Sequence, residues 1–552
     1  MSKSLIIHHN NVVDMAAFDA QIIFDLNGKI DTYIHTKIIP MIKNSEPDII
    51  FIKDNLSSNY LELYGITLAY HIRLSKELED RHFVPIVILS DVDACVLNKL
   101  DSNANILFTQ NMYVIPNRIE QIEHFLNKDK VYAKKMDEKL FLSNISVKPP
   151  KETSHDIANE WAIYQWSHLL NVSSEAISKN TDKISSMLYF KYLVAKYHLE
   201  TKTNSKIKPT QKSGKVLLID DRWNDGWKDI MDSFIKQKYS DVTPVVLEDD
   251  FKNKTIDDVK TSLEKKIGET DPHIILLDLR LLENDKNVKI DQKKSINKLS
   301  GMQLIDAIKK INPGIQIIMF TASGDSLILD EIHNREILGY VKKDAPEDKY
   351  ESSKNSFKKL DTLIKKGMEQ KYLKTAWMIQ YRTLQLSFLL NNSNPVIFEL
   401  RKNIMSVFDV LNSNMPNSFE YAMLGIFKCI ELLNDYFIEE KWENNKKYSF
   451  WKGTNNKIKT LDYDELKETK NGDYNLATEN KIRAIIDDKT SLSNNLMNEQ
   501  IKQIVCSRNY SMHPQEKDSC RNYLIREPKA EHIIEWFEML FSIVKSFRNY
   551  TT

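Results

Sequence analysis

The chain has 552 residues, of which 42% are hydrophobic and 28% are charged, and its 77 basic residues are balanced by 77 acidic residues. This length predicts three or more domains, and the composition is that of a globular protein with enough apolar material for several cores. A net charge of zero excludes a broadly basic surface, so any affinity for nucleic acid would have to come from a local patch.

Targeting signals and cysteine patterns are weak. The beginning, MSKSLIIHHNN, lacks the long apolar core of a signal peptide. No stretch approaches the roughly 20 apolar residues that a membrane-spanning helix needs. We therefore expect a cytoplasmic protein with reduced thiols, no membrane contact, and neither a zinc site nor a disulfide framework, since no CxxC pair occurs among its four cysteines. They are Cys95, Cys429, Cys506 and Cys520.

Residues 1–135 predict an α/β domain. Short apolar runs typical of buried parallel strands occur at KSLIIHH (3–9), PDIIFIK (47–53) and VPIVILS (84–90), with a helical pattern at GITLAYHIR (65–73). Strands that alternate with helices favour a doubly wound parallel sheet.

Residues 136–212 predict a helical connector and a linker. Ser154 is a plausible N-cap for DIANEWAIYQWSHLL, whose apolar residues recur at helical spacing. The segment KTNSKIKPTQKSGK (202–215) is polar, contains Pro and Gly, and is typical of a linker.

Residues 213–350 predict a second α/β domain. It parallels the first domain segment by segment, which indicates an internal repeat. The five predicted strands are KVLLID (215–220), TPVVLE (243–248), PHIILLD (272–278), IQIIMFT (315–321) and LGYVKK (338–343).

The rest of the chain predicts helices. Residues 351–395 predict one connecting helix, and residues 396–552 an all-α domain in which no strand pattern follows Pro395. The polar stretch NNKKYSFWKGTNNKIK is expected to be a long loop. Two apolar helix faces are formed by Phe419, Met423, Ile426, Ile430, Leu433 and Phe437, and by Ile533, Trp536, Leu540, Ile543 and Phe547.

Polar side chains end the predicted strands of the second α/β domain. Because the carboxyl ends of parallel strands share one edge of a sheet, Asp220, Asp221, Asp278, Thr321 and Lys343 should converge. Three carboxylates repel one another unless a cation joins them, and Mg²⁺ prefers such oxygen ligands. A carboxylate can accept a phosphoryl group when Mg²⁺, a lysine and a hydroxyl neutralise the phosphoryl oxygens. The alternative is that the acids only cap strand ends.

These motifs, LLIDD, ILLDLR, MFTAS and GYVKKDAP, resemble the receiver domain of response regulators over residues 213–350. The resemblance implies that Asp278 is phosphorylated by a sensor histidine kinase or another phosphodonor. The polar stretch at 283–300 departs from the family as an insertion beside the acceptor. The other roles implied by the resemblance are Mg²⁺ binding by Asp220, Asp221, Asp278 and the backbone carbonyl of Arg280, phosphoryl contact by Thr321 and Lys343, and a switch aromatic at Tyr340.

The first α/β domain resembles a receiver that has lost this chemistry. His8 and His9 stand where the metal-binding acids would be, and Lys53 stands where the acceptor would be, although Ser90 remains. We expect a dimerisation or docking role. A metal or ligand site that uses the histidine pair is the alternative.

The stretch SRNYSMHP (507–514) combines an arginine and a histidine. Arg508 lies on the same predicted helix face as the apolar Ile501 and Ile504, and His513 precedes Pro514, which disfavours helical geometry at the histidine. A histidine can move protons at the 2′-OH and the leaving oxygen of RNA, while an arginine holds the phosphate. No metal is then needed.

The string Arg508-Asn509-x-x-x-His513 resembles the R-N-x-x-x-H motif of the HEPN superfamily over residues 396–552. The resemblance implies catalytic Arg508, Asn509 and His513, no metal for this domain, and an acidic helix residue that we assign to Glu431 or Asp435. Two alternatives are a helix end whose Arg and His make local hydrogen bonds, and a HEPN-like bundle that binds without cutting.

Together these patterns predict a multidomain protein with two doubly wound parallel α/β receiver-like domains, helical connectors and a C-terminal all-α HEPN-like bundle. The predicted function is a phosphorylation-regulated, metal-independent endoribonuclease that works as a homodimer on RNA. Family analogy suggests antiphage defence or stress-induced growth arrest. The alternative is a non-catalytic two-component signalling protein whose bundle binds protein or RNA.

Overall fold

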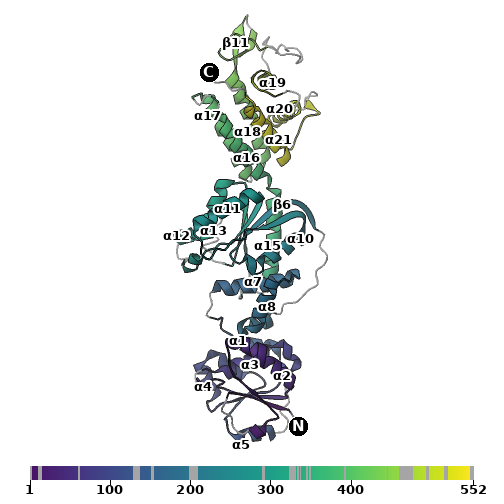
Figure 1. Cartoon of the computed structure of the whole chain (residues 1–552). Helices are drawn as coiled ribbons and strands as arrows, with labels where there is room; N and C mark the ends of the chain where they lie inside the picture. The colour runs from purple at the N-terminus through teal and green to yellow at the C-terminus, as the bar shows by residue number, and fades with distance from the viewer. Residues whose placement is uncertain are drawn as a thin grey trace.

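The computed structural model is elongated, with an N-terminal α/β unit, a middle α/β unit and a C-terminal helical unit stacked in chain order (Figure 1). Among the described residues, no helix is both long and apolar enough to cross a membrane. The structure describes residues 3–9, 15–59, 62–127, 137–150, 154–197, 209–288, 293–322, 331, 335, 337–343, 346, 350–388, 390, 393–413, 415–443, 446–458, 477–492, 497–514 and 520–547.

The N-terminal unit is a parallel sheet of five strands in the order β2-β1-β3-β4-β5. This is a doubly wound order, as the alternation of strands and helices predicted. The strands are β1 (Ser4–His8), β2 (Ala20–Ile23), β3 (Ile49–Lys53), β4 (Ile86–Leu89) and β5 (Met112–Ile115). The helices are α1 (Ile30–Tyr33), α2 (Ile39–Ser45), α3 (Tyr64–Leu74), α4 (Ala94–Leu100) and α5 (Ile119–Asn127).

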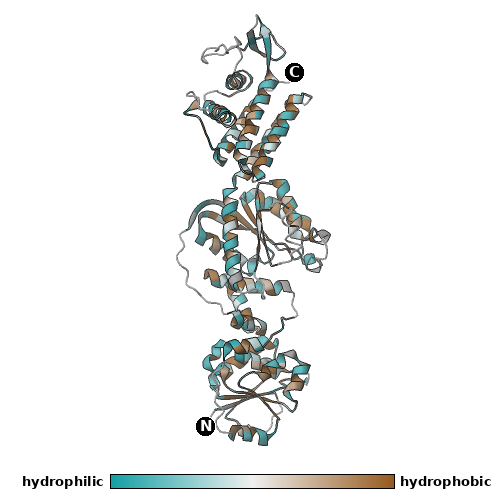
Figure 2. Cartoon of the chain, turned by 180° about the vertical axis from the view of Figure 1, so that it is seen from behind, coloured by the Kyte–Doolittle hydropathy of each residue, from teal (hydrophilic) through white to brown (hydrophobic). Residues whose placement is uncertain are grey.

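The middle unit repeats this topology with the parallel order β10-β9-β8-β6-β7. Its strands β8 and β9 are buried along their whole length, which explains their continuous apolar sequence, and the strands of both sheets are largely brown in Figure 2. The strands are β6 (Thr210–Ile219), β7 (Tyr239–Val246), β8 (Ile274–Leu277), β9 (Gln316–Thr321) and β10 (Gly339–Lys342). The helices are α10 (Trp227–Lys238), α11 (Ile256–Thr270), α12 (Lys293–Ile296), α13 (Ser300–Ile311) and α15 (Tyr350–Glu369).

The connector between the two units is helical, as predicted. It contains α6 (Glu138–Asn144), α7 (Ser154–Leu170), α8 (Glu175–Ser186) and α9 (Leu188–Tyr197). The segment 202–215, predicted as a linker, is partly strand, because β6 begins at Thr210 and pairs there with Tyr239 of β7. Pairing with a neighbouring strand overrides the polar composition of this segment.

The prediction of one connecting helix over 351–395 is wrong. The segment forms α15 and a second helix, α16 (Tyr372–Ser387), separated by a turn at 370–371. Met368 of α15 is buried in the core of the middle unit, whereas Leu373 of α16 is buried in the core of the helical unit. The chain turns between α15 and α16 because the apolar residues of α15 pack into the middle unit and those of α16 pack into the helical unit.

The C-terminal unit packs helices around one core, which includes both apolar faces predicted from the sequence. The helix α16 lies against α17 and α21, and α18 against α17, α20 and α21. The helices are α17 (Pro395–Asn412), α18 (Ser418–Phe437), α19 (Thr478–Lys489), α20 (Asn498–Met512) and α21 (Ala530–Lys545).

The all-α prediction for this unit is wrong at one place. An antiparallel hairpin, β11 (Ile438–Glu443) and β12 (Lys446–Trp451), follows α18. It pairs Ile438 with Trp451 and Trp442 with Lys447. The runs FIEEKWE and YSFW contain aromatic and β-branched residues, which favour strands, and two asparagines lie between the runs, but the overall polarity of the stretch obscured this signal.

Candidate functional site

Three carboxylates meet at the carboxyl edge of the middle sheet. Asp220 and Asp221 follow β6, Asp278 follows β8, and these strands are parallel neighbours. One carboxylate oxygen from each residue lies within 4.8 Å of the other two. Asp220 and Asp278 are fully buried. The structure thus brings these acids together as their positions at strand ends predicted.

The acid cluster is suited to a cation. Asp221 Oδ1 is buried and, among the described residues, has no hydrogen-bond partner. Burial, and then the nearby Asp220 and Asp278, raise the pKa of Asp221 to about 8. Burial also raises the pKa of Asp220, against the opposing effect of Lys343. Three carboxylates at this spacing could hold a hard divalent cation such as Mg²⁺.

Lys343 supplies a positive charge within the cluster. Its Nζ lies 2.8 Å from Asp220 Oδ2 and 2.6 Å from Asp278 Oδ2, and the side chain is fully buried. Burial by itself would lower the pKa of Lys343, but Asp220 and Asp278 together raise it. Lys343 is therefore a buried ammonium beside the predicted acceptor.

The three other residues predicted for this site lie around it. Thr321 is fully buried at the end of β9, and its carbonyl accepts the backbone N–H of Lys343 at 2.7 Å. Tyr340 is half-buried in β10, with Lys359 Nζ 4.4 Å from its ring centroid. Arg280 donates through its guanidinium to the carbonyl of Asp285.

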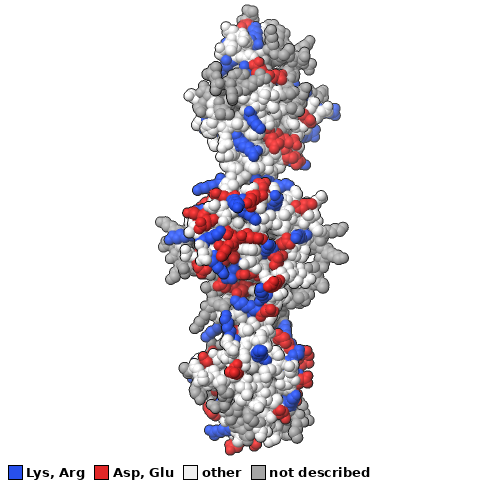
Figure 3. All heavy atoms as spheres, in the orientation of Figure 1, with Lys and Arg blue, Asp and Glu red and all other residues white. Residues whose placement is uncertain are grey.

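An open hollow adjoins the cluster. It has a volume of about 660 Å³, and both Asp221 and Arg280 line it. Asp and Glu side chains gather on a face of the middle unit in Figure 3. The hollow is therefore a polar, largely acidic approach to the predicted metal position, and five further acids line it: Asp225, Glu248, Asp249, Asp250 and Glu283.

The insertion predicted at 283–300 is anchored beside the acceptor. Within its described part, Asp285 is buried, and its Oδ2 accepts the backbone N–H groups of Leu281 and Leu282, each at 3.0 Å. Its Oδ1 accepts the N–H of Ser300 at 3.1 Å. Asp285 therefore ties both ends of the insertion to the loop that follows Asp278.

Sequence reasoning missed Asn159 of α7. Its Oδ1 lies 3.2 Å from Lys343 Nζ, and Trp227 Nε1 donates to the same oxygen at 3.4 Å. No local pattern could have signalled this contact, because Asn159 and Lys343 are 184 residues apart in the chain.

The same edge of the N-terminal unit carries different residues. A Cβ on Gly65 would lie 2.2 Å from the carbonyl oxygen of Lys53, and a Cβ on Gly301 would lie 2.4 Å from that of Asp278. This shared close approach identifies Lys53 as the counterpart of Asp278. His8 is buried at the end of β1, where burial lowers its pKa, and its Nε2 lies 3.3 Å from Gln21 Oε1.

Near this edge, other polar groups of the N-terminal unit pair with one another. His9 Nδ1 lies 2.8 Å from the carbonyl oxygen of Phe24. Ser90 donates to Asp54 Oδ2 at 2.5 Å. The two histidines therefore contact different partners in β2 and the segment after it, and Ser90 contacts Asp54.

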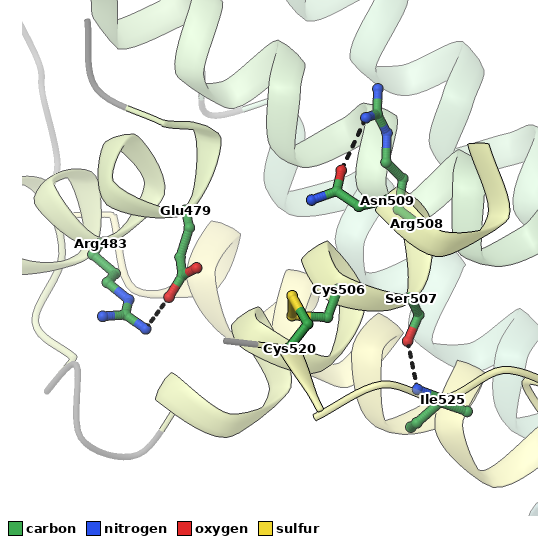
Figure 4. The surroundings of a disulfide bond; sticks show 8 residues. All are labelled: Glu479, Arg483, Cys506, Ser507, Arg508, Asn509, Cys520 and Ile525. Carbon is green, nitrogen blue, oxygen red and sulfur yellow. Dashed lines mark hydrogen bonds and ion pairs between the residues drawn. A yellow bond between two sulfur atoms is a disulfide. The ribbon is translucent and has the colours of Figure 1, made fainter. Parts of the chain in front are cut away.

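Arg508 lies on α20 against α18. Its Nη1 donates to Asn509 Oδ1 at 3.1 Å, and its Nη2 lies 3.9 Å from Glu431 Oε1 (Figure 4 shows Arg508 and Asn509). The guanidinium also lies 4.8 Å from the ring centroid of Phe427. Of the two acidic candidates, the structure places Glu431 beside Arg508.

His513 ends α20, as the following Pro514 predicted. The helix closes at Met512, and His513 has extended backbone angles, with φ of −144° and ψ of 92°. Its N–H donates to the carbonyl of Asn509 at 2.9 Å, and its side chain is exposed. Arg508 and His513 therefore lie on the last turn of one helix and just beyond it.

The expectation of reduced thiols is wrong for one pair. Cys506 and Cys520 form a disulfide with a Cα–Cα distance of 5.5 Å (Figure 4). The pair is 14 residues apart and encloses the Arg508–His513 motif. Absence of a CxxC pattern did not exclude it, because the return of the chain alongside α20 brings the two thiols together. Cys95 and Cys429 are free.

One comparison with known proteins concerns the N-terminal unit. Residues 6–115 match the family model described as Inactive Receiver domain. No curated protein matches the chain. The signal receiver domain of a Luxo repressor protein from Vibrio parahaemolyticus is similar at 18% identity, over 29% of this chain and 92% of that chain, with a TM-score of 0.19.

Two structures of NtrX from Brucella abortus are also similar. The first has 17% identity over 34% of this chain and 33% of that chain, with a TM-score of 0.20. The second, a complex with ADP, has 17% identity over 35% of this chain and 34% of that chain, with a TM-score of 0.19. This chain thus spans about a third of the length of NtrX.

The family match confirms that the N-terminal unit is an inactive receiver-like copy. The middle unit repeats the sheet topology of the matched N-terminal unit. The HEPN assignment stays a prediction.

Proposed function

We propose that the chain is a phosphorylation-controlled endoribonuclease. Asp278 accepts a phosphoryl group with the help of Mg²⁺, and the C-terminal unit cleaves RNA without a metal. The convergence of Asp220, Asp221, Asp278 and Lys343 at one sheet edge carries the proposal. The phosphodonor is a sensor histidine kinase or a small acyl phosphate.

Each residue of the cluster has a role in the phosphorylation step. An Asp278 oxygen attacks the phosphorus, while the buried Lys343 ammonium and the Thr321 hydroxyl neutralise phosphoryl oxygens. Asp220 and Asp221 would hold Mg²⁺ with the carbonyl of Arg280. When bound, Mg²⁺ neutralises developing charge on the phosphoryl group. Movement of Tyr340 would then report phosphorylation to the surface of the unit.

The Arg508–His513 pair supports the nuclease part of the proposal. The guanidinium, held near Glu431, binds the scissile phosphate, and Asn509 orients it. The exposed His513 takes the proton of the 2′-OH, whose oxygen attacks the phosphorus. The bond from phosphorus to the 5′-oxygen breaks, and His513 returns a proton to that leaving oxygen. The products are a 2′,3′-cyclic phosphate and a 5′-hydroxyl. We propose that two chains join as a homodimer, so that two Arg–His sets form one cleft and phosphorylation controls the pairing.

Phosphorylation is tested with acetyl phosphate and Mg²⁺, followed by intact-mass measurement. We expect the mass gain of one phosphoryl group in wild type and no gain in Asp278→Asn. An unchanged wild-type mass, or the same gain in Asp278→Asn, would refute the acceptor assignment.

RNA cleavage is tested in EDTA after activation, with a labelled RNA and its DNA counterpart. We expect RNA to be cut and DNA to resist, because the 2′-OH is the nucleophile.

The variants test the two side chains. His513→Ala should lose about 10²–10⁴-fold in cleavage rate. Arg508→Lys should also lose cleavage, because an ammonium cannot reproduce the bidentate fork of the guanidinium. Equal cutting of DNA, or loss of cutting in EDTA, would show the mechanism to be mistaken. Intact RNA with every form of the protein would favour a binding module instead.

A further inference from the structure

The helix α7 is shared by the cores of the two α/β units, between which it lies in both views of the molecule (Figures 1 and 2). Ile157 and Trp161 are buried in the N-terminal core. Ala162, Ile163 and Trp166 are buried in the core of the middle unit, on the face of its sheet that α10 and α15 cover. A change in the position of α7 would therefore disturb both units.

Asn159 links α7 to the acid cluster. It is only 2% exposed, and its Oδ1 lies within hydrogen-bond distance of both Lys343 Nζ, at 3.2 Å, and Trp227 Nε1, at 3.4 Å. The Trp227 ring lies beside the same ammonium, with its centroid 5.3 Å from Nζ. The amide oxygen is therefore held by the middle unit and aimed at Lys343.

Asn159 is one of two hydrogen-bond acceptors of the ammonium. Asp278 Oδ2 accepts at 2.6 Å and Asn159 Oδ1 at 3.2 Å, and Asp220 Oδ2 lies 2.8 Å from Nζ as an ion-pair partner. Asp220 and Asp278 belong to the acid cluster itself, whereas Asn159 comes from the connector.

Two more contacts tie α7 to elements around the site. Asp156, one turn before Asn159, pairs with Arg222, which directly follows the predicted metal ligand Asp221. Gln165 pairs with Ser353 of α15, the helix that leads to the C-terminal unit. The helix α7 therefore contacts the acid edge and the outgoing helix together.

We propose that Asn159 is a positioning residue for phosphoryl transfer at Asp278, and that α7 couples the N-terminal unit to the phosphorylation state of that site. This inference rests on the proposed phosphorylation of Asp278. Asn159 acts through Lys343 by holding one of its N–H groups while the ammonium faces Asp220 and Asp278. No residue of the N-terminal unit need touch the phosphoryl group, because α7 transmits the change.

The chemical step explains the coupling. An Asp278 oxygen forms a bond to phosphorus, the bond from phosphorus to the acetate oxygen of acetyl phosphate breaks, and acetate leaves with the electron pair. One carboxylate oxygen of Asp278 then carries the phosphoryl group, so Lys343 must shift from its present contact toward a phosphoryl oxygen. That shift changes its distance to Asn159 and therefore the anchoring of α7.

The first test compares phosphorylation rates of full-length variants with acetyl phosphate and Mg²⁺. Asn159→Ala should lower the maximal rate about tenfold or more, because a misplaced catalytic group costs rate strongly, while the half-saturating donor concentration stays near that of wild type. Asn159→Asp keeps an acceptor oxygen at the same position and should recover much of the rate. The matched control is Asn180→Ala in α8, whose amide donates to the Glu160 carbonyl at 2.9 Å and should leave the rate unchanged.

The second test follows hydrogen exchange over α7 before and after phosphorylation. We expect exchange across 154–170 to change in wild type and to change much less in Asn159→Ala. A wild type that is not phosphorylated would overturn the proposed function and this inference together. If wild type is phosphorylated but Asn159→Ala matches it in rate, or α7 exchange stays the same, only the inference falls. A rate loss that follows lowered thermal stability and is not recovered by Asn159→Asp would also overturn it.

Discussion

At the scale of single residues, His273 illustrates how burial sets a protonation state. It lies just before β8, and its Nδ1 accepts the backbone N–H of Lys215 at 3.2 Å. Burial, followed by the positive charge of Lys374, lowers the pKa of His273 from its ordinary value of 6.5 to about 4. An imidazole that accepts a hydrogen bond through Nδ1 must be unprotonated there, so the folded chain favours neutral His273.

This shift predicts a pH dependence of stability. Above pH 6.5 the histidine is neutral in both states, whereas between pH 6.5 and 4 the unfolded chain binds a proton that the folded chain does not. Stability should therefore fall as the pH drops through this window. His273→Asn keeps an acceptor without titrating and should show a weaker loss in denaturant unfolding at several pH values. Identical profiles for the two proteins would contradict the assignment.

The Cys506–Cys520 disulfide is a second feature at this scale, and it predicts sensitivity to reduction. A cross-link that closes a loop of this size stabilises by about 3 kcal/mol, mainly by restricting the unfolded chain. Reduction should lower the unfolding temperature of the C-terminal unit. The Cys506→Ser, Cys520→Ser double variant should unfold like the reduced protein and ignore the reductant. Equal unfolding of oxidised and reduced wild type would show that the bond contributes nothing.

At the scale of elements, the junction between the middle unit and α16 depends on backbone contact. Asn312 Nδ2 donates to the carbonyl of Lys374 at 3.1 Å, and Lys374 Nζ donates to the carbonyl of Asp271 at 2.9 Å. A Cβ on Gly314 would lie 2.4 Å from the backbone of Leu373. The first turn of α16 thus rests directly on the loop before β9.

Gly314→Ala should therefore weaken the contact between the loop before β9 and the first turn of α16. The added methyl group meets backbone, which cannot rotate away, so we expect a loss of about 1–3 kcal/mol in the free energy of unfolding. Gly268→Ala in α11 is the matched control, because a Cβ there has no atom within 4 Å. Alanine at that helical position should gain about 0.5–1 kcal/mol. Equal effects of the two substitutions would refute the close-contact argument.

At the scale of the whole molecule, the N-terminal unit has kept the fold and lost the acids. Its counterpart of Asp278 is Lys53, so it offers no carboxylate at the acceptor position. Its core is shared with the connector, because Trp161, Phe190 and Leu193 pack into it. The unit therefore covers apolar surface that the connector would otherwise expose.

Deletion of residues 1–135 should accordingly separate assembly from chemistry. Asp278 should still accept a phosphoryl group, because Asp220, Asp221 and Lys343 remain. The exposed connector should change the number of chains per particle found by light scattering, or the regulation of RNA cleavage. Loss of phosphorylation from a middle unit that stays folded would assign chemistry to the N-terminal unit. An unchanged number of chains per particle with unchanged regulation would exclude a scaffold role.

The sequence by itself determined the features that follow from local pattern. Continuous apolar runs ending in polar residues predicted two parallel sheets, and the common edge of parallel strands brought Asp220, Asp221 and Asp278 together without knowledge of the packing. The backbone restriction imposed by Pro514 predicted where α20 ends. The hairpin after α18 was also encoded locally, although its polar composition concealed it.

Only the tertiary structure decided which distant segments touch. The contacts of Asn159 with Lys343 and of Glu431 with Arg508, and the pairing of Cys506 with Cys520, join different elements. Helical or strand periodicity states which face of an element is apolar, but it does not state which other element covers that face. The sequence therefore predicted only a helical connector, whereas the packing buries the amide of Asn159 in the candidate site.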